Sequence, residues 1–459
     1  MLSCREGKPD VARLLDWLYL LLLAAASPWL IFEGLRKGKY REGFAAKFLG
    51  SVPLRAGNRP CVWLHAVSVG EVNLLATLIA TWRQCRPDWQ CVVSTTTMTG
   101  FRLATKKYPD CTVFYCPLDF SWAVRRAMAR VRPACLVLAE LELWPNLIAA
   151  AQAAGARVVV VNGRLSPRSF RGYRRIRWLM GRVLRQVDRV LVQNDEYAAR
   201  FRALGAPTDR VRVTGSLKFD GAQADRHNAA TMRLAELAGF APDDVIFLAG
   251  STQAPEEALA LAAFRQLAPH HPRLRLVLVP RHPDRFAAIG QTLTAAGVSW
   301  QRRSQLDAHG ADPQARVLLV DAMGELGAWW GTAQIAFVGG SLGRRGGQNM
   351  VEPAAYGAAV SFGPNTQNFR DIVAALLQHD AAVVVSDGPQ LTAFVRRCLD
   401  EPQWAADLGA RASRFVASQQ GATRRTWELL EPLVSDNALA AGPMPRGHTG
   451  PGHLRLVRR

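Results

Sequence analysis

Short apolar runs alternate with amphipathic segments along most of the chain, and this alternation predicts a parallel α/β fold. The first series of runs, between residues 61 and 216, reads CVWLHAVS, WQCVVSTTT, CTVFYCP, ACLVLAELE, ARVVVVNG, RVLVQND and VRVTGS. The second series, between residues 245 and 387, reads VIFLAGST, LRLVLVPRHP, VLLVDAM, QIAFVGGS, AAVSFGP and AAVVVSD. Strands that are apolar on both faces are typical of parallel sheets covered by helices. Two doubly wound domains in tandem are therefore the simplest architecture.

Changes in composition predict where these domains begin and end. We expect a membrane anchor with a basic flank at 1–40, a first Rossmann-like domain at 41–222, a polar linker at 223–229, a second Rossmann-like domain at 230–434 and a disordered basic tail at 435–459. The tail is rich in Gly, Pro and basic residues, which favours disorder. Two domains of this kind offer a cleft between opposed strand ends, and such a cleft is the default binding site.

The N-terminal region contains one uncharged apolar stretch, WLYLLLLAAASPWLIF, at residues 17–32. It is shorter than the roughly 20 apolar residues that usually span a bilayer, and Ser27 and Pro28 interrupt it. A spanning helix and an interfacial helix are both compatible with this pattern. No cleavage site of a secretory signal follows, and the basic residues just downstream place the next domain in the cytoplasm.

The formal net charge of +20 would attract nucleic acid, anionic lipid or a phosphorylated substrate. An apolar N-terminus favours the anionic membrane surface, and no nucleic-acid-binding module is recognisable, so nucleic acid is not an expected partner. The segment SPRSFRGYRRIRW combines basic and aromatic residues, which suits a lipid headgroup zone, although an ordinary solvated helix face would look similar. Its arginines are Arg168, Arg171, Arg174, Arg175 and Arg177.

The eight cysteines are scattered, several of them lie in apolar runs, and no Cys-x-x-Cys is present. They are typical of reduced core residues in a cytosolic domain. The nine histidines show no metal-binding spacing. We therefore expect neither a structural nor a catalytic metal.

Acidic residues follow two predicted strands of the first domain. In WLHAVSVGEVNLLATLI, Glu71 stands where a strand gives way to a helix, the position at which α/β sheets bind ligands. In LVLAELELWP, Glu140 and Glu142 would face the same way if the strand continued through them. Lys218, in GSLKFD after the last strand, could reach the same cleft. The alternatives are a first-turn acid for Glu71 and an ordinary exposed lysine for Lys218.

Three strand-end segments of the second domain should lie along one edge of its sheet. They are PRHP at 280–283, GEL at 324–326 and GGSLGRRGGQNMVEP at 339–353. The glycine-rich segment would let backbone N–H groups approach a phosphate, and a helix starting near Asn349 would direct its positive end there. The segment is neither a Walker A sequence nor a G-x-G-x-x-G fingerprint, which argues against an ATPase or a dehydrogenase.

Charged side chains near these segments suit the other parts of a nucleotide. Arg281 could pair with a phosphate, while Asn349 and Glu352 share a helix face from which an acid could accept ribose hydroxyl hydrogen bonds. In the alternative interpretation, Glu325 and Glu352 are first-turn acids and Arg281 is a solvated surface residue.

Seven motifs in a fixed order give the sequence a family resemblance. They are HAVSVGE, STTTMTGFRLA, ELELWPNLI, GSLKFD, PRHP, GEL and NMVEPAAYG, after a hydrophobic N-terminus. Over about residues 13–425 the chain resembles the 3-deoxy-D-manno-octulosonic acid (Kdo) transferases of lipopolysaccharide synthesis. The resemblance implies a GT-B fold, CMP-Kdo as donor, a lipid A precursor as acceptor, and inversion at the anomeric carbon without a metal. It also implies a location at the cytoplasmic face of the bacterial inner membrane.

The resemblance assigns roles to individual residues. Glu71 resembles the family's general base, and Glu140 and Lys218 look like its transition-state stabilisers, with Glu142 a competing assignment for the acid. The implied CMP contacts are Pro280, Arg281, Gly324, Glu325, Leu326, Asn349, Met350, Val351 and Glu352.

The sequence departs from the family in three places that affect fine positioning. Ser216 stands where the family often has Asn, and Gln348 and Met350 stand where it often has His and Pro.

Two other functions are compatible with the same residues. One is a membrane-associated GT-B transferase that uses a UDP-sugar. The other is a non-catalytic membrane adaptor that binds polyanions through its basic surface.

Overall fold

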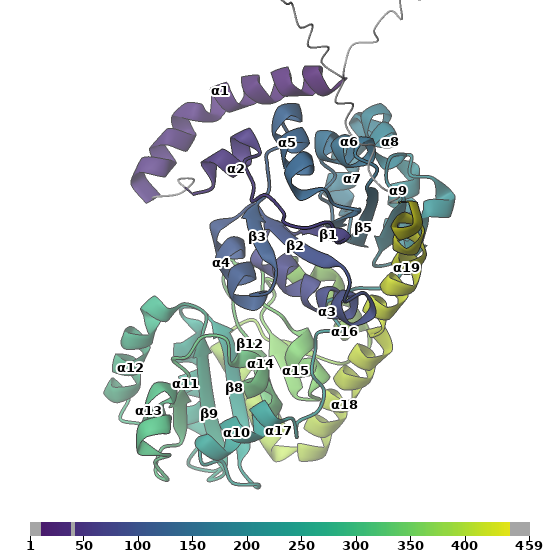
Figure 1. Cartoon of the computed structure of the whole chain (residues 1–459). Coiled ribbons are helices and arrows are strands. Elements are labelled where there is room, and N and C mark those ends of the chain that lie inside the picture. The colour runs from purple at the N-terminus through teal and green to yellow at the C-terminus, as the bar shows by residue number, and fades with distance from the viewer. Residues whose placement is uncertain (1–10, 38–41, 441–459) are drawn as a thin grey trace, which may run out of the picture. The chain divides into compact units, whose positions relative to one another are not determined.

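The computed structural model describes residues 11–37 and 42–440. The chain divides into two compact units, one holding residues up to Leu217 and from Gly421 onward, the other holding Lys218–Gln420. Each unit has a seven-stranded sheet with helices on its faces (Figure 1). Both sheets are parallel throughout, as the continuous apolar runs predict.

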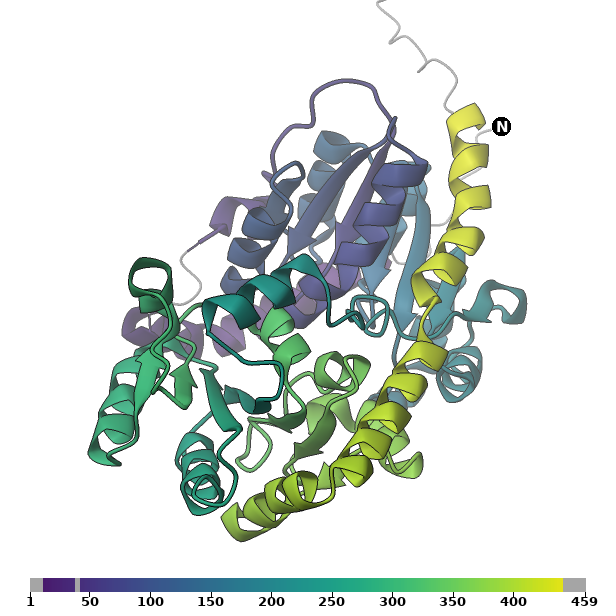
Figure 2. The ribbon, with the colours of Figure 1, turned by 90° about the horizontal axis from the view of Figure 1, so that it is seen from below.

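The sheet of the first unit has the order β3-β2-β1-β4-β5-β6-β7, so the winding direction reverses between β1 and β4. Its arrows run side by side in Figure 2. The strands are β1 (Cys61–His65), β2 (Gln90–Thr95), β3 (Thr112–Tyr115), β4 (Cys135–Ala139), β5 (Arg157–Gly163), β6 (Arg189–Val192) and β7 (Val211–Val213). Ligands of open α/β sheets bind where the winding reverses, which here is the edge after β1 and β4.

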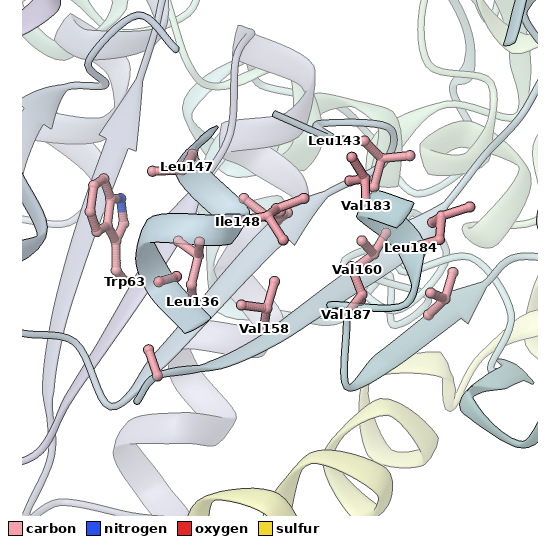
Figure 3. Packing of buried hydrophobic residues seen from close by; sticks show 14 of the residues in the cluster. Trp63, Leu136, Leu143, Leu147, Ile148, Val158, Val160, Val183, Leu184 and Val187 are labelled. Carbon is pink, nitrogen blue, oxygen red and sulfur yellow. The ribbon is translucent and has the colours of Figure 1, made fainter. Parts of the chain in front are cut away.

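Helices cover both faces of this sheet because successive side chains of each strand point to opposite sides. On one face, Trp63, Leu136, Val158 and Val160 pack against apolar residues of α6 and α8 (Figure 3). The other face packs against α3 and α19, where Trp82 meets Trp427 edge to face. The helices of this unit are α1 (Val11–Lys37), α2 (Phe44–Leu49), α3 (Val69–Cys85), α4 (Met98–Lys107), α5 (Ser121–Val131), α6 (Pro145–Ala153), α7 (Pro167–Arg175), α8 (Arg177–Leu184), α9 (Asp195–Ala203) and α19 (Ala422–Ala440), with a 3-10 turn at Thr208–Arg210.

The sheet of the second unit has the order β10-β11-β9-β8-β12-β13-β14, with its reversal between β8 and β12. The strands are β8 (Val245–Thr252), β9 (Leu274–Pro280), β10 (Trp300–Arg302), β11 (Val317–Leu319), β12 (Ile335–Val338), β13 (Ala359–Phe362) and β14 (Val383–Val384). The helices are α10 (Ala229–Leu237), α11 (Glu256–Leu267), α12 (Phe286–Ala295), α13 (Arg303–His309), α14 (Leu326–Trp329), α15 (Val351–Ala355), α16 (Arg370–Gln378), α17 (Gly388–Asp400) and α18 (Pro402–Gln419), with 3-10 turns at Pro283–Arg285, Trp330–Thr332 and Gln367–Phe369.

Every strand that the apolar runs predict forms, although most end before the polar residues that close each run. The short strand β10 was not predicted, because its sequence, WQR, has no apolar run. The change of unit falls at Leu217, ahead of the predicted linker, and α19 returns to the first unit instead of closing the second. The predicted tail is helical as far as Ala440, and residues 441–459 lie outside the described part.

The predicted anchor region forms helix α1, which contains Pro28. Among residues 11–37 and 42–440, no helix is both long enough and apolar enough to cross a membrane. The apolar run of the predicted anchor lies between the charged residues Asp16 and Glu33. Residues 1–10 and 38–41 of the anchor and its basic flank lie outside the described residues.

Polar contacts attach α1 to the first unit. Both carboxylate oxygens of Asp16 accept hydrogen bonds from Ser121, at 2.7 Å from its N–H and 2.6 Å from its hydroxyl, so Asp16 serves the open N-terminus of α5. The Tyr19 hydroxyl donates to Asp119, 3.1 Å away, and Asp119 also accepts from the first N–H groups of α6. Apolar side chains at helical spacing on α1 stay exposed: Leu14, Trp17, Leu18, Leu21 and Leu22.

Candidate active site

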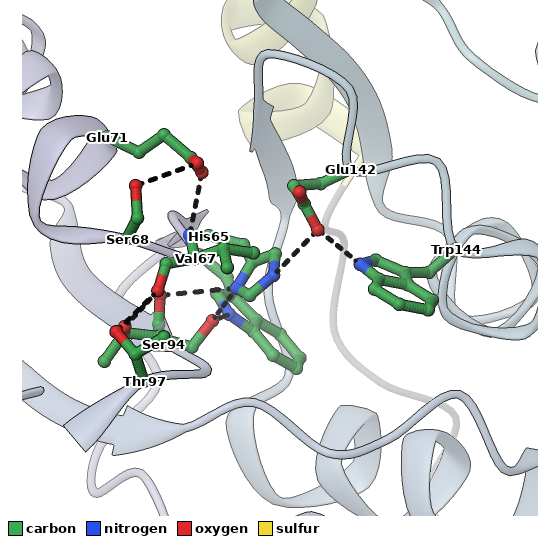
Figure 4. A network of polar contacts seen from close by, with 10 residues as sticks. His65, Val67, Ser68, Glu71, Ser94, Thr97, Glu142 and Trp144 are labelled. Atoms are coloured by element: carbon green, nitrogen blue, oxygen red, sulfur yellow. Dashed lines mark hydrogen bonds and ion pairs between the residues drawn. The ribbon is translucent and has the colours of Figure 1, made fainter. Parts of the chain in front are cut away.

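The loop after β1 holds Glu71 in a defined orientation. Glu71 occupies the first turn of α3, and its Oε2 accepts a 2.8 Å hydrogen bond from the Val67 N–H (Figure 4). Its Oε1 accepts from the Ser68 hydroxyl at 3.1 Å. The spacing Ser-x-x-Glu and the backward reach of the acid resemble a capping box. Glu71 is thus a first-turn acid whose side chain holds the two residues before α3, and it also lies at the sheet edge expected for a site.

Two threonines fix the peptide group that contacts Glu71. The Val67 carbonyl accepts hydrogen bonds from the hydroxyls of Thr95, at 3.1 Å, and Thr97, at 3.0 Å. The Val67 N–H faces Glu71, so both sides of this residue are held. The STTT motif after β2 therefore supports the loop after β1.

Burial raises the pKa of Glu71 to about 7, against the lowering effect of the Val67 hydrogen bond. The negative charges of Glu140 and Glu142 raise it further. A carboxylate with a pKa near neutrality accepts a proton far more readily than an exposed one. Glu71 is therefore suited to general-base chemistry at physiological pH.

Strand β4 ends at Ala139, so the condition for Glu140 and Glu142 to face the same way is not met. Glu140 adopts a left-handed backbone conformation, with φ of 54°, and its N–H donates to Val161 at 2.9 Å. The side-chain amide of Asn162 donates to Glu140 Oε1 at 3.4 Å. A non-glycine residue in this conformation stores strain of order 1 kcal/mol, and such residues cluster at functional sites.

Glu142 belongs to a different polar network (Figure 4). Its Oε2 accepts a 2.7 Å hydrogen bond from the Trp144 indole and lies 3.8 Å from Nε2 of His65. On the other side of the ring, His65 Nδ1 lies 2.9 Å from the Ser94 hydroxyl, which also accepts from the Trp63 indole at 2.7 Å. This network connects the ends of β1, β2 and β4.

His65 is fully buried, and its charge state matters for Glu142. Burial opposes protonation, but Cys116 and Glu142 together raise the pKa of His65 to about 10. An imidazolium here lies within ion-pair distance of the Glu142 carboxylate, 3.8 Å from His65 Nε2 to Glu142 Oε2. Glu142 therefore pairs with His65, and Glu140 accepts a hydrogen bond from the Asn162 amide.

Lys218 is the first residue of the second unit and follows β7 within a turn. Its Nζ lies 5.7 Å from the centre of the Phe369 ring. The structure thus brings together Glu71, Glu140 and Glu142 in the first unit, and it places Lys218 in the second unit with the nine predicted CMP contacts.

The glycine-rich segment after β12 already has a carboxylate bound to its first amides. Glu256, which is 1% exposed, accepts hydrogen bonds from the N–H groups of Gly340, Ser341 and Leu342, at 2.7, 3.0 and 3.0 Å. It also accepts from the Gln253 N–H at 2.8 Å. The expectation that these amides approach a phosphate is corrected, because each of them donates to Glu256.

The segment that carries Asn349 and Glu352 is held by local hydrogen bonds. The Asn349 amide donates to Glu352 Oε1 at 2.9 Å and accepts from the Val351 N–H at 3.1 Å. Met350 and Val351 have no exposed surface, backbone included, so the structure presents neither of these predicted contacts to a ligand. Helix α15 begins at Val351, slightly later than predicted, and has five residues.

Glu325 is engaged by a side chain that the sequence analysis did not identify. Arg303 donates to both oxygens of Glu325 at 2.9 Å, in a bidentate pair, and Trp329 donates to the same carboxylate at 3.2 Å. Gly324 next to it has φ of 94°, which favours glycine. The Glu325 carboxylate therefore stabilises the loop.

The PRHP segment starts at Pro280, the last residue of β9. The Arg281 N–H donates to the Thr252 carbonyl at 3.0 Å, which ties this segment to the end of β8. The Arg281 side chain is exposed and can contact an anion.

Neither metal nor disulfide chemistry is evident in the described part of the chain. No group of three or more His, Cys, Asp or Glu side chains there could hold a metal ion. The seven cysteines that the structure describes are free, and Cys4 lies outside it.

The sequence analysis missed His65, Asn162, Glu256 and Arg303. His65 begins the HAVSVGE motif, so its position was visible although its role was not. Glu256 was hidden within an acidic pair at a helix start, where two acids are common. The partners of Asn162 and Arg303 are distant in sequence, so no local pattern revealed them.

Two doubly wound units of this kind define a GT-B-like fold. A UDP-GlcNAc 2-epimerase from Neisseria meningitidis, bound to UDP-GlcNAc, has the same fold, with a TM-score of 0.57, 13% identity, and coverage of 81% of this chain and 100% of that one. Residues 39–221 match the family model described as 3-Deoxy-D-manno-octulosonic-acid transferase (kdotransferase). The chain belongs to the 3-deoxy-D-manno-octulosonic acid transferase family of glycosyltransferases.

Similar proteins support this membership along most of the chain. The chain is 36% identical to a 3-deoxy-D-manno-octulosonic acid transferase from Bordetella pertussis, over 90% of this chain and 95% of that protein. It is 31% identical to one from Haemophilus influenzae, over 91% of this chain and 99% of that protein.

Proposed function

We propose that this protein transfers Kdo from CMP-Kdo to a sugar hydroxyl of a lipid A precursor, with inversion and without a metal. Family membership supports Kdo transfer. The observation that carries the proposal is Glu71, a half-buried carboxylate with a pKa raised to about 7 at the sheet edge where the winding reverses. No resident cofactor takes part, because CMP-Kdo is consumed as a substrate.

In the proposed reaction Glu71 takes the proton of the acceptor hydroxyl as its oxygen attacks the anomeric carbon of Kdo. The bond from that carbon to the CMP phosphate breaks, and CMP leaves with the electron pair. Positive charge grows on the sugar and negative charge on the phosphate, as in other glycosyl transfers. Glu140 opposes the first charge, and Lys218 and Arg281 oppose the second.

The second unit provides the donor site in this proposal. Arg281 pairs with the CMP phosphate, and the backbone groups of the 324–326 segment contact the nucleotide. Asn349 and Glu352 bind ribose hydroxyls through a pair already ordered by its own 2.9 Å hydrogen bond. Glu256 and Arg303 contact no ligand but hold the loops in shape.

We also propose that the protein works at the cytoplasmic face of the bacterial inner membrane, where its acceptor is embedded. Exposed apolar side chains of α1, such as Trp17 and Leu21, suit an interfacial helix. The exposed arginines of α7, together with Trp178, which is 67% exposed, suit anionic headgroups and the phosphates of the acceptor.

One experiment tests this function directly. Purified protein is incubated with CMP-Kdo and a tetraacylated lipid A precursor, and the product is weighed by mass spectrometry. We expect a mass increase of one or more Kdo residues, which the Glu71→Gln variant does not produce. Absence of product with the wild-type protein would refute the proposal.

Parallel incubations separate the alternatives. A product formed only from a UDP-sugar, together with thermal protection by UDP and not by CMP, would indicate a different transferase. No turnover of any donor, with salt-sensitive binding to every polyanion, would indicate a binding protein.

A further inference from the structure

Strand β5 contains an irregularity beside Glu140. Val160 pairs with Val190 and Gly163 pairs with Val192, so β5 has one more residue than β6 in this interval. Asn162 lies in the interval, with φ of 54° and no exposed surface. Bulges of this kind redirect side chains and are over-represented next to active sites.

Both the oxygen and the nitrogen of the Asn162 side-chain amide make hydrogen bonds. Its Oδ1 accepts a 3.0 Å hydrogen bond from the Leu217 N–H, and because a backbone N–H only donates, the acceptor must be the oxygen. Its Nδ2 therefore faces Glu140, 3.4 Å from Oε1. The orientation of the amide follows from these two partners.

The backbone of Asn162 is also held. The Gln193 side chain donates to the Asn162 carbonyl at 3.1 Å, and the Glu140 N–H donates to the preceding carbonyl, that of Val161, at 2.9 Å. Glycine would adopt the left-handed conformation at lower cost than asparagine. Glycine would lack the two amide contacts that Asn162 makes with Leu217 and Glu140.

We propose that Asn162 is a positioning residue for the transfer reaction, holding the Glu140 carboxylate and the backbone of Leu217, immediately before Lys218. This inference rests on the proposed function, which gives Glu140 and Lys218 their roles at the transition state. Asn162 donates a 3.4 Å hydrogen bond to Glu140 and brings no positive charge beside it, so this contact orients the carboxylate without offsetting its charge. The hydrogen bonds around residues 140 and 162 hold both of them in left-handed backbone conformations.

Two substitutions separate positioning from folding. Asn162→Gly suits the backbone conformation and removes both amide contacts. Asn162→Asp keeps an acceptor for the Leu217 N–H but places a second carboxylate against Glu140. The control is Asn194→Asp, because Asn194 caps α9 by accepting from the Tyr197 N–H at 2.9 Å, and aspartate caps helices equally well.

We expect both Asn162 variants to lower kcat by about tenfold while the KM values for CMP-Kdo and the lipid acceptor stay within about threefold, because only the transition state uses Glu140 fully. Asn162→Asp should also move the acid side of the pH profile of kcat upward by about half a unit or more, because its negative charge adds to those that already raise the pKa of Glu71. Asn162→Gly should leave that side in place. Asn194→Asp should behave as wild type.

A wild-type kcat in either Asn162 variant would overturn the inference. So would a loss of kcat that matches the loss of folded protein measured by thermal unfolding, with an unshifted pH profile in Asn162→Asp. If one variant does not fold, the other decides by the same criteria. Failure of the wild-type protein to transfer Kdo would refute the proposed function instead, so the two failures are distinguishable.

Discussion

The Val67 N–H donates a 2.8 Å hydrogen bond to the Glu71 carboxylate, and this contact fixes the proposed base at the start of α3. Hydrogen bonds to a carboxylate lower its pKa, but burial outweighs them here and raises the pKa of Glu71 to about 7. The same group thus serves the helix start and retains the basicity that proton abstraction requires.

Replacing Glu71 with Gln should abolish most of the catalysis without affecting donor binding. We expect kcat to fall by about 10²–10⁴-fold, the usual contribution of a general base, while CMP binding measured by calorimetry stays unchanged. In the wild-type protein, kcat should rise as the pH passes about 7, where Glu71 loses its proton. Full turnover by the variant would exclude the base role.

The raised pKa of Glu71 also predicts how stability depends on pH. Between its ordinary value of 4.5 and about 7, the folded protein keeps a proton that the unfolded chain releases, so stability falls as the pH rises through this window. Glu71→Gln removes this cost and should be more stable than wild type at pH 8 by about 2 kcal/mol, with no difference near pH 4. Urea unfolding at the two pH values tests this, and equal stability at both would contradict it.

Glu140 and Glu142 should respond differently to the same substitution. Glu140→Gln should lower kcat by about 10²-fold with little effect on stability, as expected for a group that stabilises the transition state. Glu142→Gln leaves the buried His65 without its carboxylate and should lower the free energy of unfolding by about 1–3 kcal/mol.

The pH dependence of the Glu142→Gln effect follows from His65. Cys116 and, to a smaller extent, Glu142 raise the pKa of His65 from its ordinary 6.5 to about 10. The part of this stabilisation that Glu142 supplies is therefore full below pH 6.5 and is lost as the pH rises through 10. The difference from wild type should shrink across that range. A large loss of kcat without loss of stability in Glu142→Gln would instead identify Glu142, and not Glu140, as the carboxylate that stabilises the transition state.

The fold was predictable because parallel strands buried on both faces are continuous apolar runs, and these runs are visible without tertiary information. Glu71 was predictable for the same reason, since it lies where such a run ends. The hydrogen-bond partners of the site residues were not predictable. Ser94 meets His65 only because β1 and β2 pair in one register, with His65 opposite Ser94, and no local pattern encodes that register.

The sequence pattern also did not predict which unit α19 belongs to. An amphipathic pattern shows that α19 buries one face but not which sheet covers it, and only the contacts of Trp427 with Trp82 place it on the first unit. The glycine-rich segment was predicted to bind phosphate because free amides attract anions. Glu256 is itself an anion from the same chain, and it reaches amides 84 to 86 residues away in sequence.

Glu256→Gln should loosen the glycine-rich segment. Glutamine has one acceptor oxygen, so its NH₂ group would face amide N–H groups that only donate. We expect a loss of about 2–3 kcal/mol in unfolding free energy and roughly tenfold weaker CMP binding. The control is Glu236→Gln, an exposed residue of α10 in the same unit. Unchanged CMP affinity together with reduced stability would limit Glu256 to a folding role.

Arg281→Ala should weaken donor binding and leave the fold intact, because the Arg281 side chain is exposed and its backbone makes the structural contact. Loss of a charge-assisted contact to phosphate corresponds to a Kd for CMP about tenfold higher or more, with a smaller salt dependence. Cytidine, which has no phosphate, should bind both proteins equally. Arg265→Ala, at an exposed position of α11, is the control, and an equal effect there would indicate a nonspecific charge effect.

The membrane proposal predicts two separable contributions to vesicle binding. Leu21→Ser combined with Leu22→Ser removes apolar surface from the exposed face of α1 and should weaken binding to neutral and anionic vesicles alike, by about tenfold or more. Arg171→Glu combined with Arg174→Glu should remove only the preference for vesicles that contain anionic phosphatidylglycerol, and this preference in wild type should decline with added salt. Vesicle sedimentation measures both.

The matched control for charge reversal is Arg265→Glu combined with Arg396→Glu, at exposed positions of α11 and α17. This pair changes the net charge by the same amount as the α7 pair, so a general effect of net charge would appear in both. Reduced binding only in the α7 pair would locate the anionic contact on that helix. Equal reduction of vesicle binding in both double variants would show that the net charge of the protein, and not α7, attracts the anionic vesicles. Attraction by net charge does not depend on which arginines are reversed.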